Sequence, residues 1–185
     1  MVFSSFTFLF AFFPLILVIY FFPPFRKREV RNGILLLFSL AFYSFGGWRL
    51  MPVIFLSIVI NYICGRLSDR EQKDSIRKVA VAGAIICNLL LLFVFKYLGF
   101  LTENLHQLFP GIPVKELVLP IGISFYTFQG MSYIIDVYRD RTMGTRNFAK
   151  LILYISFFPQ LIAGPIIKYH DVAAMIDDRK CTPEK

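Results

Sequence analysis

The sequence has few charged residues for its length. Asp, Glu, Lys and Arg make up only 17% of its 185 residues, while 57% are hydrophobic. Soluble domains carry about 25% charged residues. A water-soluble fold of this size could not hide so much apolar surface, because a folded protein still needs polar residues on its outside. The scarcity of charge therefore excludes a soluble globular domain and a disordered chain, and it leaves an integral membrane protein.

Cysteine is also scarce, and short catalytic motifs are absent. The three cysteines, Cys64, Cys87 and Cys181, form no CxxC or Cys/His spacing, which excludes a disulfide scaffold and predicts no metal site. There is no GxSxG, P-loop or GxGxxG pattern. The net charge of +8 comes from residues that lie between apolar runs rather than on a soluble basic module, so nucleic acid is not expected as a partner.

Long apolar runs are what the sequence does contain. A membrane-spanning helix needs about 20 apolar residues. The runs cover residues 3–22, 33–48, 51–65, 79–101, 117–138 and 148–167, the last of them interrupted by prolines. We therefore expect one all-α, polytopic membrane domain over residues 1–185. It would have about five transmembrane helices, a broken or re-entrant sixth segment and a polar tail at residues 168–185.

The basic residues are unevenly distributed among the connecting loops. Cytoplasmic loops of membrane proteins carry an excess of lysine and arginine. The loops after the first, third and fifth runs hold Arg26, Lys27, Arg28, Arg31, Arg66, Arg70, Lys73, Arg77, Lys78, Arg139, Arg141, Arg146 and Lys150, whereas the remaining loops and span ends hold Arg49, Lys96 and Lys115. This asymmetry predicts that the N-terminus lies outside and that the three basic loops lie in the cytoplasm.

The fifth run carries a polar stripe. At about 100° per residue, an arc of about 120° contains Tyr126, Gln129, Ser132, Tyr133 and Asp136. An aspartate at the centre of a membrane costs about 2.5–3.5 kcal/mol on insertion scales, so we expect the stripe to face protein or a wet cavity. Two interpretations remain open: the stripe lines a substrate tunnel, or it makes hydrogen bonds between helices, with Asp136 paired to Arg139.

The sixth run contains helix-breaking residues. Pro159 removes a backbone donor in the middle of the run, and Gly164 and Pro165 should end the helix. Broken backbone at membrane depth persists only where protein or water satisfies it. A re-entrant or tilted broken segment beside a cavity is one interpretation, with Gln160 next to the break. A kinked but otherwise ordinary span is the other.

Other polar residues favour structural roles. Asn61 and Asn88 lie in apolar runs, where they are expected to form hydrogen bonds with neighbouring helices. His106 and His170 could act as general bases by their chemistry. Because the sequence places no acidic or nucleophilic partner beside either one, we interpret both histidines as surface or packing residues.

Four stretches of the chain resemble the membrane-bound O-acyltransferase (MBOAT) family, in particular its bacterial alginate O-acetyltransferase branch. They are NYICGRL at 61–67, FKYLGF at 95–100, LPIGISFYTFQGMSYIIDVYR at 119–139 and LYISFFPQLIAGPI at 153–166. The last two are long and specific. The resemblance extends over essentially the whole chain, in the order expected of the N-terminal half of a family member.

The resemblance implies a multi-helix fold around a tunnel through the bacterial inner membrane. Family members transfer an acyl group from a cytoplasmic thioester donor, acyl-CoA or an acylated carrier protein, to a hydroxyl, often of an extracytoplasmic polysaccharide. The implied partners are the bilayer, the polysaccharide, the donor and a periplasmic acetyl-transfer protein, with no bound cofactor or metal. It favours a tunnel-lining or substrate-binding role for Tyr126, Gln129, Ser132, Tyr133, Asp136, Arg139, Pro159, Gln160, Gly164 and Pro165.

The chain also departs from the family pattern. The characteristic histidine of the family lies in a later apolar segment, beyond the equivalent of residue 185, and neither His106 nor His170 matches its context. We therefore expect no catalytic residue within these residues, which would be the N-terminal part of a larger enzyme and inactive alone. A transporter or flippase would predict inverted repeats, which the sequence does not show. A non-catalytic membrane subunit would not need the polar stripe.

Overall fold

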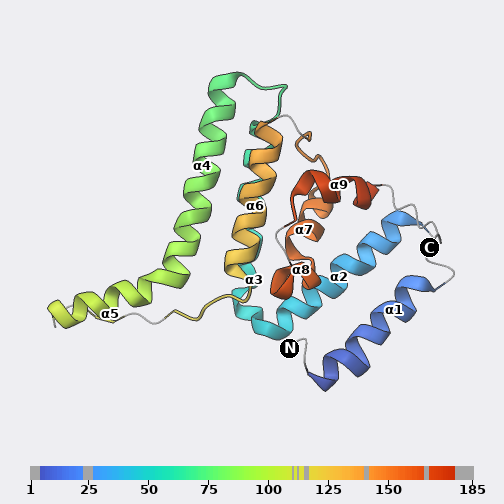
Figure 1. The fold of residues 1–185 in the computed structure, drawn as a ribbon, viewed down its shortest axis with the longest axis horizontal. Coiled ribbons are helices and arrows are strands. Elements are labelled where there is room, and N and C mark those ends of the chain that lie inside the picture. The colour runs from blue at the N-terminus through green and yellow to red at the C-terminus, as the bar shows by residue number, and fades with distance from the viewer. Residues whose placement is uncertain are drawn as a thin grey trace.

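Helices are the only regular elements in the part of the chain that the structure describes. A computed structural model describes residues 5–22, 27–109, 111, 113–114, 117–139, 142–164 and 167–177 (Figure 1). In chain order the elements are η1 (Phe8–Phe12), α1 (Phe13–Phe21), α2 (Arg28–Gly47), η3 (Trp48–Leu50), α3 (Met51–Leu67), α4 (Asp74–Leu92), η4 (Phe93–Tyr97), α5 (Leu98–Leu108), α6 (Ile123–Tyr138), α7 (Phe148–Ser156), α8 (Phe158–Ala163) and α9 (Tyr169–Asp177). The predicted all-α class is confirmed for these ranges.

Two continuous helical stretches are long and apolar enough to cross a membrane. They cover Arg28–Leu67 and Asp74–Leu108, and a shorter apolar helix covers Phe8–Phe21. The first stretch turns a corner between α2 and α3, where Gly47 has φ +154°, a conformation that other residues rarely adopt. The corner lies at Gly46 and Gly47, next to the predicted end of the second apolar run at residue 48. The count of about five spans remains a prediction.

Two helix boundaries differ from those predicted. The fifth apolar run was expected to begin at residue 117, but α6 begins at Ile123. The reason is Gly122, whose left-handed backbone (φ +72°) starts the helix later. The predicted polar tail also begins with a helix, α9, which packs against α6 and α7. Residues 178–185 of that tail lie outside the described ranges.

The centre of the fold is a close packing of α3, α4 and α6, which lie side by side, while α2 packs against α7 on the other side (Figure 1). Small residues make this approach possible. A Cβ added to Gly130 of α6 would lie 2.3 Å from the Asn61 side chain of α3. A Cβ added to Gly65 of α3 would lie 2.5 Å from the ring of Tyr133.

A buried amide network joins α3 to α4. Asn61 Nδ2 donates to Asn88 Oδ1 at 3.1 Å, and Asn88 Nδ2 donates back to Asn61 Oδ1 at 3.0 Å. The Ser57 hydroxyl donates to the same Asn88 oxygen at 3.1 Å. All three side chains are fully buried. The prediction that Asn61 and Asn88 bond to neighbouring helices is confirmed.

Replacing Asn88 with leucine is expected to lower the free energy of unfolding by about 1–3 kcal/mol, because Asn61 and Ser57 would be left buried with fewer partners. Reversible unfolding of the purified chain in mixed micelles measures the change. Cys87→Ala is the matched control, because Cys87 is the exposed neighbour on the same helix. Equal stability of the two variants would contradict the role assigned to the network.

The N-terminal helical stretch of η1 and α1 is attached to the fold by aromatic rings of η1. Phe8 and Phe12 pack against Phe42 of α2 and Phe158 of α8, with ring centroids 5.6–6.1 Å apart. The opposite face of this N-terminal stretch is apolar and exposed, as Phe10 shows. This is the arrangement expected of a helix that contacts lipid, because lipid solvates apolar side chains.

Candidate functional site

The polar stripe of α6 faces the interior of the protein. Tyr126, Gln129, Tyr133 and Asp136 are each at most 3% exposed. Ser132 is half-buried, whereas Arg139, just beyond the end of the helix, is exposed. The expectation that the stripe faces protein is confirmed by this burial, and Arg139 does not belong to the buried set.

Each level of the stripe meets a polar group from a different part of the chain. In the first half of the stripe, Tyr126 neighbours Tyr43 of α2 and Gln129 contacts Gln160 of α8. Further along, Ser132 neighbours Tyr154 of α7, and the Tyr133 hydroxyl accepts the backbone N–H of Thr145. At the end of the stripe, Asp136 contacts His170 of α9. At 1.5 Å per residue, the stripe extends over about 15 Å. It is therefore a line of polar contacts along which α2, α7, α8 and α9 meet α6.

A carboxylate–imidazole contact joins Asp136 to His170. Asp136 Oδ2 lies 3.0 Å from His170 Nδ1, and it also accepts the backbone N–H of His170 at 3.4 Å. The other ring nitrogen, Nε2, lies 3.0 Å from Asp171 Oδ1. The imidazole is thus held between a buried carboxylate and one that is largely exposed.

This contact corrects two sequence-based interpretations. Asp136 was expected to pair with Arg139 if the stripe were structural, and His170 was expected to have no acidic partner. Instead, α9 folds back onto α6 and places His170 against a residue 34 positions earlier in the chain. Residue spacing along the sequence could not predict the contact, because the direction of α9 depends on how the chain turns at the break before it. His106, in contrast, lies exposed on α5 as expected.

A carboxylate–imidazole pair can hold, orient or pass on a proton. In this arrangement both ring nitrogens of His170 already face carboxylates. This favours a role in positioning neighbouring groups over a role as the general base that removes a proton from a substrate. Within the described ranges, no group of three or more His, Cys, Asp or Glu side chains could hold a metal ion.

The sixth run is broken as the sequence predicts. Helix α7 ends at Ser156, Phe157 has a non-helical backbone, and Pro159 lies in the first turn of α8. Because α7 has nine residues, it extends over about 14 Å, well short of the ~30 Å membrane core. The segment therefore consists of two short helices separated at Phe157. Whether the segment crosses or re-enters the membrane remains a prediction.

Neighbouring groups satisfy the backbone at the break. The N–H of Phe158 donates to the Ser39 hydroxyl of α2 at 3.4 Å, as broken backbone at membrane depth requires. Helix α8 ends at Ala163, and Gly164 follows it with an extended backbone, so the predicted end of the helix is confirmed. A Cβ at Gly164 would lie 2.7 Å from Gln160 Cα. Pro165 lies outside the described residues.

A cavity of about 300 Å³ adjoins the break. Its walls are mostly apolar and are formed by Leu35, Leu153, Tyr154, Phe157, Gln160, Ile167, Asp171, Val172 and Ile176. Gln160 is the predicted candidate residue that lines it, and the same side chain accepts a hydrogen bond from Gln129 of the stripe at 3.2 Å. The cavity, the break and the stripe thus meet at Gln160.

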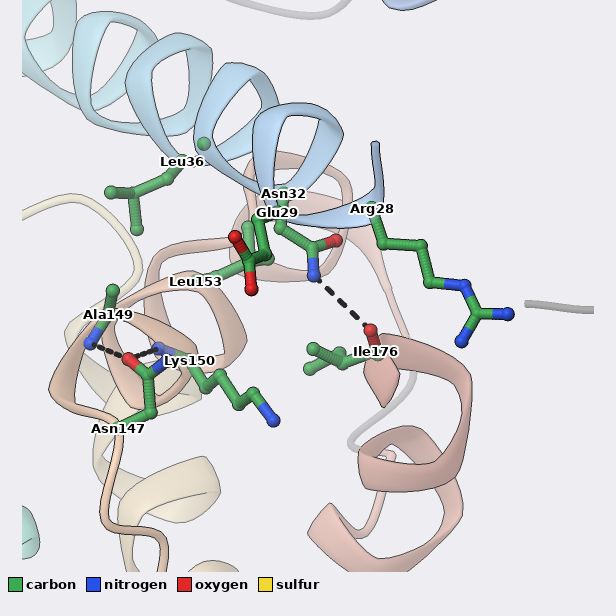
Figure 2. Close-up of a pocket in the computed structure, with 10 residues that line it drawn as sticks. Arg28, Glu29, Asn32, Leu36, Asn147, Ala149, Lys150, Leu153 and Ile176 are labelled. Carbon is green, nitrogen blue, oxygen red and sulfur yellow. Dashed lines mark hydrogen bonds between the residues drawn. The ribbon is translucent and has the colours of Figure 1, made fainter. Parts of the chain in front are cut away.

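A second, larger cavity of about 550 Å³ was missed by the sequence analysis. Figure 2 shows it between the first turns of α2 and α7 and the end of α9, lined by Arg28, Glu29, Asn32, Gly33, Leu36, Asn147, Ala149, Lys150, Leu153 and Ile176. Leu153 and Ile176 line both cavities, so the two adjoin. The sequence showed Arg28 and Lys150 only as basic residues of two different loops. Nothing in their spacing indicated that they line the same cavity.

Buried polar atoms without partners lie near the N-terminal end of the stripe, in the first half of α6. The Thr127 hydroxyl and the side-chain oxygen of Gln129 are buried and have no hydrogen-bond partner among the described residues, while the buried hydroxyls of Tyr43 and Tyr126 interact only with each other. Such atoms are rare in native proteins and mark places where water or a ligand can bind. This end of the stripe therefore has spare hydrogen-bonding capacity next to Gln160.

Comparisons with known proteins identify relatives along the whole chain. The chain is 36% identical over 193 residues to a protein of Azotobacter vinelandii named "Probable alginate O-acetylase AlgI", and 35% identical over 193 residues to one of the same name from Pseudomonas aeruginosa. Both alignments cover 100% of this chain. It is also 28% identical over 206 residues to the peptidoglycan O-acetyltransferase of Helicobacter pylori, covering 97% of this chain.

The chain is much shorter than these relatives. It covers 38%, 36% and 39% of their respective lengths. No protein-family model matches the chain, and no solved structure matches it. By their names, the first two relatives act on alginate and the third acts on peptidoglycan. All three names describe the transfer of an acetyl group to oxygen.

Proposed function

We propose that this chain belongs to the membrane-bound O-acyltransferase family, in its alginate O-acetylase-like branch, and that it forms part of an enzyme that acetylates a polysaccharide. The observation that supports this most directly is the similarity to named O-acetylases along the whole chain. The proposed acceptor is a hydroxyl of an extracytoplasmic polysaccharide. The proposed donor is a cytoplasmic thioester, either acyl-CoA or an acylated carrier protein.

The chemistry of this reaction needs a polar passage through the membrane. The acceptor oxygen attacks the thioester carbonyl, the carbon–sulfur bond breaks, and the hydroxyl proton leaves through a base and ends on the departing thiolate. Buried polar groups inside a membrane domain are costly and mark functional sites. The stripe from Tyr126 to Asp136 and the adjoining Gln160 are the groups of this chain that we assign to that passage.

The orientation and partners follow as parts of the same proposal. The excess of lysine and arginine in three loops supports an N-terminus outside the bacterial inner membrane and basic loops in the cytoplasm. The thioester donor would then approach from the side of Arg28 and Lys150. A periplasmic acetyl-transfer protein would receive or direct the acetyl group on the opposite side.

A chimera tests the proposed function. The aligned segment of the Azotobacter vinelandii relative is replaced by these 185 residues in a strain that lacks its own gene, and the O-acetyl content of secreted alginate is measured. We expect acetylation to be restored to at least about a hundredth of the level given by the intact relative, since small misplacements in an active site cost up to about 100-fold. A chimera that inserts stably into the membrane yet leaves alginate without acetyl groups would contradict the proposal.

A further inference from the structure

The helical stretch that begins with α4 is longer than a membrane is thick. It runs without interruption from Asp74 to Leu108, 35 residues that extend over about 52 Å at 1.5 Å per residue. The hydrocarbon core of a bilayer is only about 30 Å thick. Helix α4 by itself has 19 residues and extends over about 28 Å, which matches the core. The remaining part, η4 and α5, therefore does not fit into the same crossing.

The stretch changes direction at η4. This segment is a π-helix, and π-bulges are one of the recognised causes of a sharp bend in a helix. Figure 1 shows that α5 turns away from the line of α4 and lies across the direction of α3, α4 and α6. Lys96 of η4 lies over the ring of Tyr97, 5.5 Å from its centroid, and lysine and tyrosine both favour the boundary between lipid and water. The bend is therefore placed at the membrane surface, with α5 along it.

Helix α5 has an apolar face that the described part of the chain leaves uncovered. None of its residues is buried, and η4, which precedes it, is the element that it mainly contacts. At about 100° per residue, an arc of about 80° contains Leu98, Leu101, Leu105 and Leu108. The opposite side carries Glu103, Asn104 and Gln107, together with one apolar residue, Phe100, in the first turn. A helix divided in this way is typical of the membrane surface, where one face contacts lipid chains and the other contacts water.

The apolar face of α5 continues a surface of α4 that is also exposed. Only 22% of the 18-residue apolar window of this stretch is buried within the protein. Ile86, Leu90 and Phe93 are among its exposed side chains. Because the helix is continuous, lipid that surrounds α4 also reaches α5. Attraction to anionic headgroups does not explain this placement, since α5 contains Glu103 but no lysine or arginine, so burial of the leucines is what holds the helix at the surface.

We propose that α5 is an interfacial helix, which lies in the membrane surface with its leucine face among the lipid chains and its Glu103 side in the headgroups. Its partner is the lipid surface itself, on the side of the membrane opposite the loop between α3 and α4. Lys96 donates to the Ser124 hydroxyl at 3.3 Å, which connects the bend to the first turn of α6. Because of this link, the embedded helix fixes the depth at which α6, and with it the buried stripe, begins.

Tryptophan fluorescence in lipid vesicles tests the assignment. Trp48 is the only tryptophan of the chain, so Trp48→Phe gives a background in which Leu105→Trp reports on the apolar face and Gln107→Trp on the opposite face. The 185-residue chain is reconstituted in phosphatidylcholine that is brominated either near the headgroup or near the chain end. We expect the shallow bromines to quench Leu105→Trp at least about twofold more strongly than Gln107→Trp, because an interfacial helix inserts its apolar face by about 5–10 Å. Ile86→Trp, within α4, should be quenched more strongly by the deep bromines.

Two further substitutions separate the apolar face from the rest of the helix. In the Leu105→Trp background, Leu101→Glu should reduce quenching to the level of Gln107→Trp, since a charged side chain on the leucine face opposes insertion. Glu103→Gln, on the opposite side of the same helix, should leave quenching unchanged. Circular dichroism checks that each variant is folded.

Three results would overturn the proposal, whether or not the acetyl-transfer proposal holds. Equal quenching of Leu105→Trp and Gln107→Trp would show that the leucine face is not turned toward lipid, as it would be if a second copy of the chain covered it. Stronger quenching of both by the deep bromines would show that α5 continues the crossing of α4. Absence of quenching at Ile86→Trp would show that α4 does not face lipid, which removes the surface that α5 continues.

Discussion

Replacing His170 with leucine is expected to lower the free energy of unfolding by about 3–5 kcal/mol, because the substitution leaves the Asp136 carboxylate buried without its partner. Asp136 is 3% exposed and contacts both the ring and the backbone N–H of His170. The loss should also weaken the contact between α9 and α6, which is otherwise held by Tyr169 against Tyr133. Reversible unfolding of the purified chain in mixed micelles measures the change.

Two further variants distinguish the charge from mere packing. Asp136→Asn removes the buried charge together with the need to pair it, so its cost should be only about 1 kcal/mol, the value of one ordinary hydrogen bond. Combined with His170→Leu, it should recover part of the loss, because no unpaired carboxylate would remain. If His170→Leu unfolds like the unmodified chain, the Asp136–His170 contact does not stabilise the fold.

The second large effect is expected from Gly122→Val, which should destabilise the fold by about 3 kcal/mol. Gly122 has φ +72°, which costs a residue with a Cβ about 1–2 kcal/mol. Its Cβ would also lie 2.8 Å from the Leu161 side chain and from the Leu161 carbonyl oxygen of α8, and overpacking of this kind costs about 1–3 kcal/mol. The same micelle unfolding assay gives the value.

Gly83→Ala provides the matched control for this substitution. Gly83 lies within α4, and a Cβ there would meet nothing within 4 Å. Alanine should therefore be neutral or stabilise the helix by up to about 1 kcal/mol. In the alginate chimera, Gly122→Val should lower acetylation more than Gly83→Ala does, because pushing α8 away from α6 separates Gln160 from Gln129. Equal effects of the two substitutions would show that the turn before α6 is not a tight contact.

The periodicity of the sequence was sufficient to identify the buried stripe. Residues three and four apart share a helix face, so Tyr126, Gln129, Tyr133 and Asp136 had to lie together on any helix. The cost of polar groups in lipid then required that face to turn inward. The break near Pro159 was equally predictable, because proline and glycine act on the local backbone. Both features depend only on neighbouring residues.

The partners of the stripe could not be predicted in the same way. His170 meets Asp136 across 34 residues of sequence, and Gln160 meets Gln129 across 31. Which side chains meet depends on where α8 and α9 turn after the break. That direction is set by contacts such as the one between Gly122 and Leu161. Residue spacing along the sequence cannot predict such contacts. For this reason the structural interpretation of the stripe offered only Arg139, a basic neighbour along the same helix, as a partner for Asp136.

The sequence by itself predicted a membrane protein, and it determined the helical content, the polar face of α6 and the family resemblance, because these follow from composition, from the helical period and from local motifs. Only the tertiary structure decided that His170 has an acidic partner and that Arg28, Glu29 and Lys150 line one cavity. The physical reason is that α2, α7 and α9 are distant in sequence. Their side chains share a site only after the helices have packed.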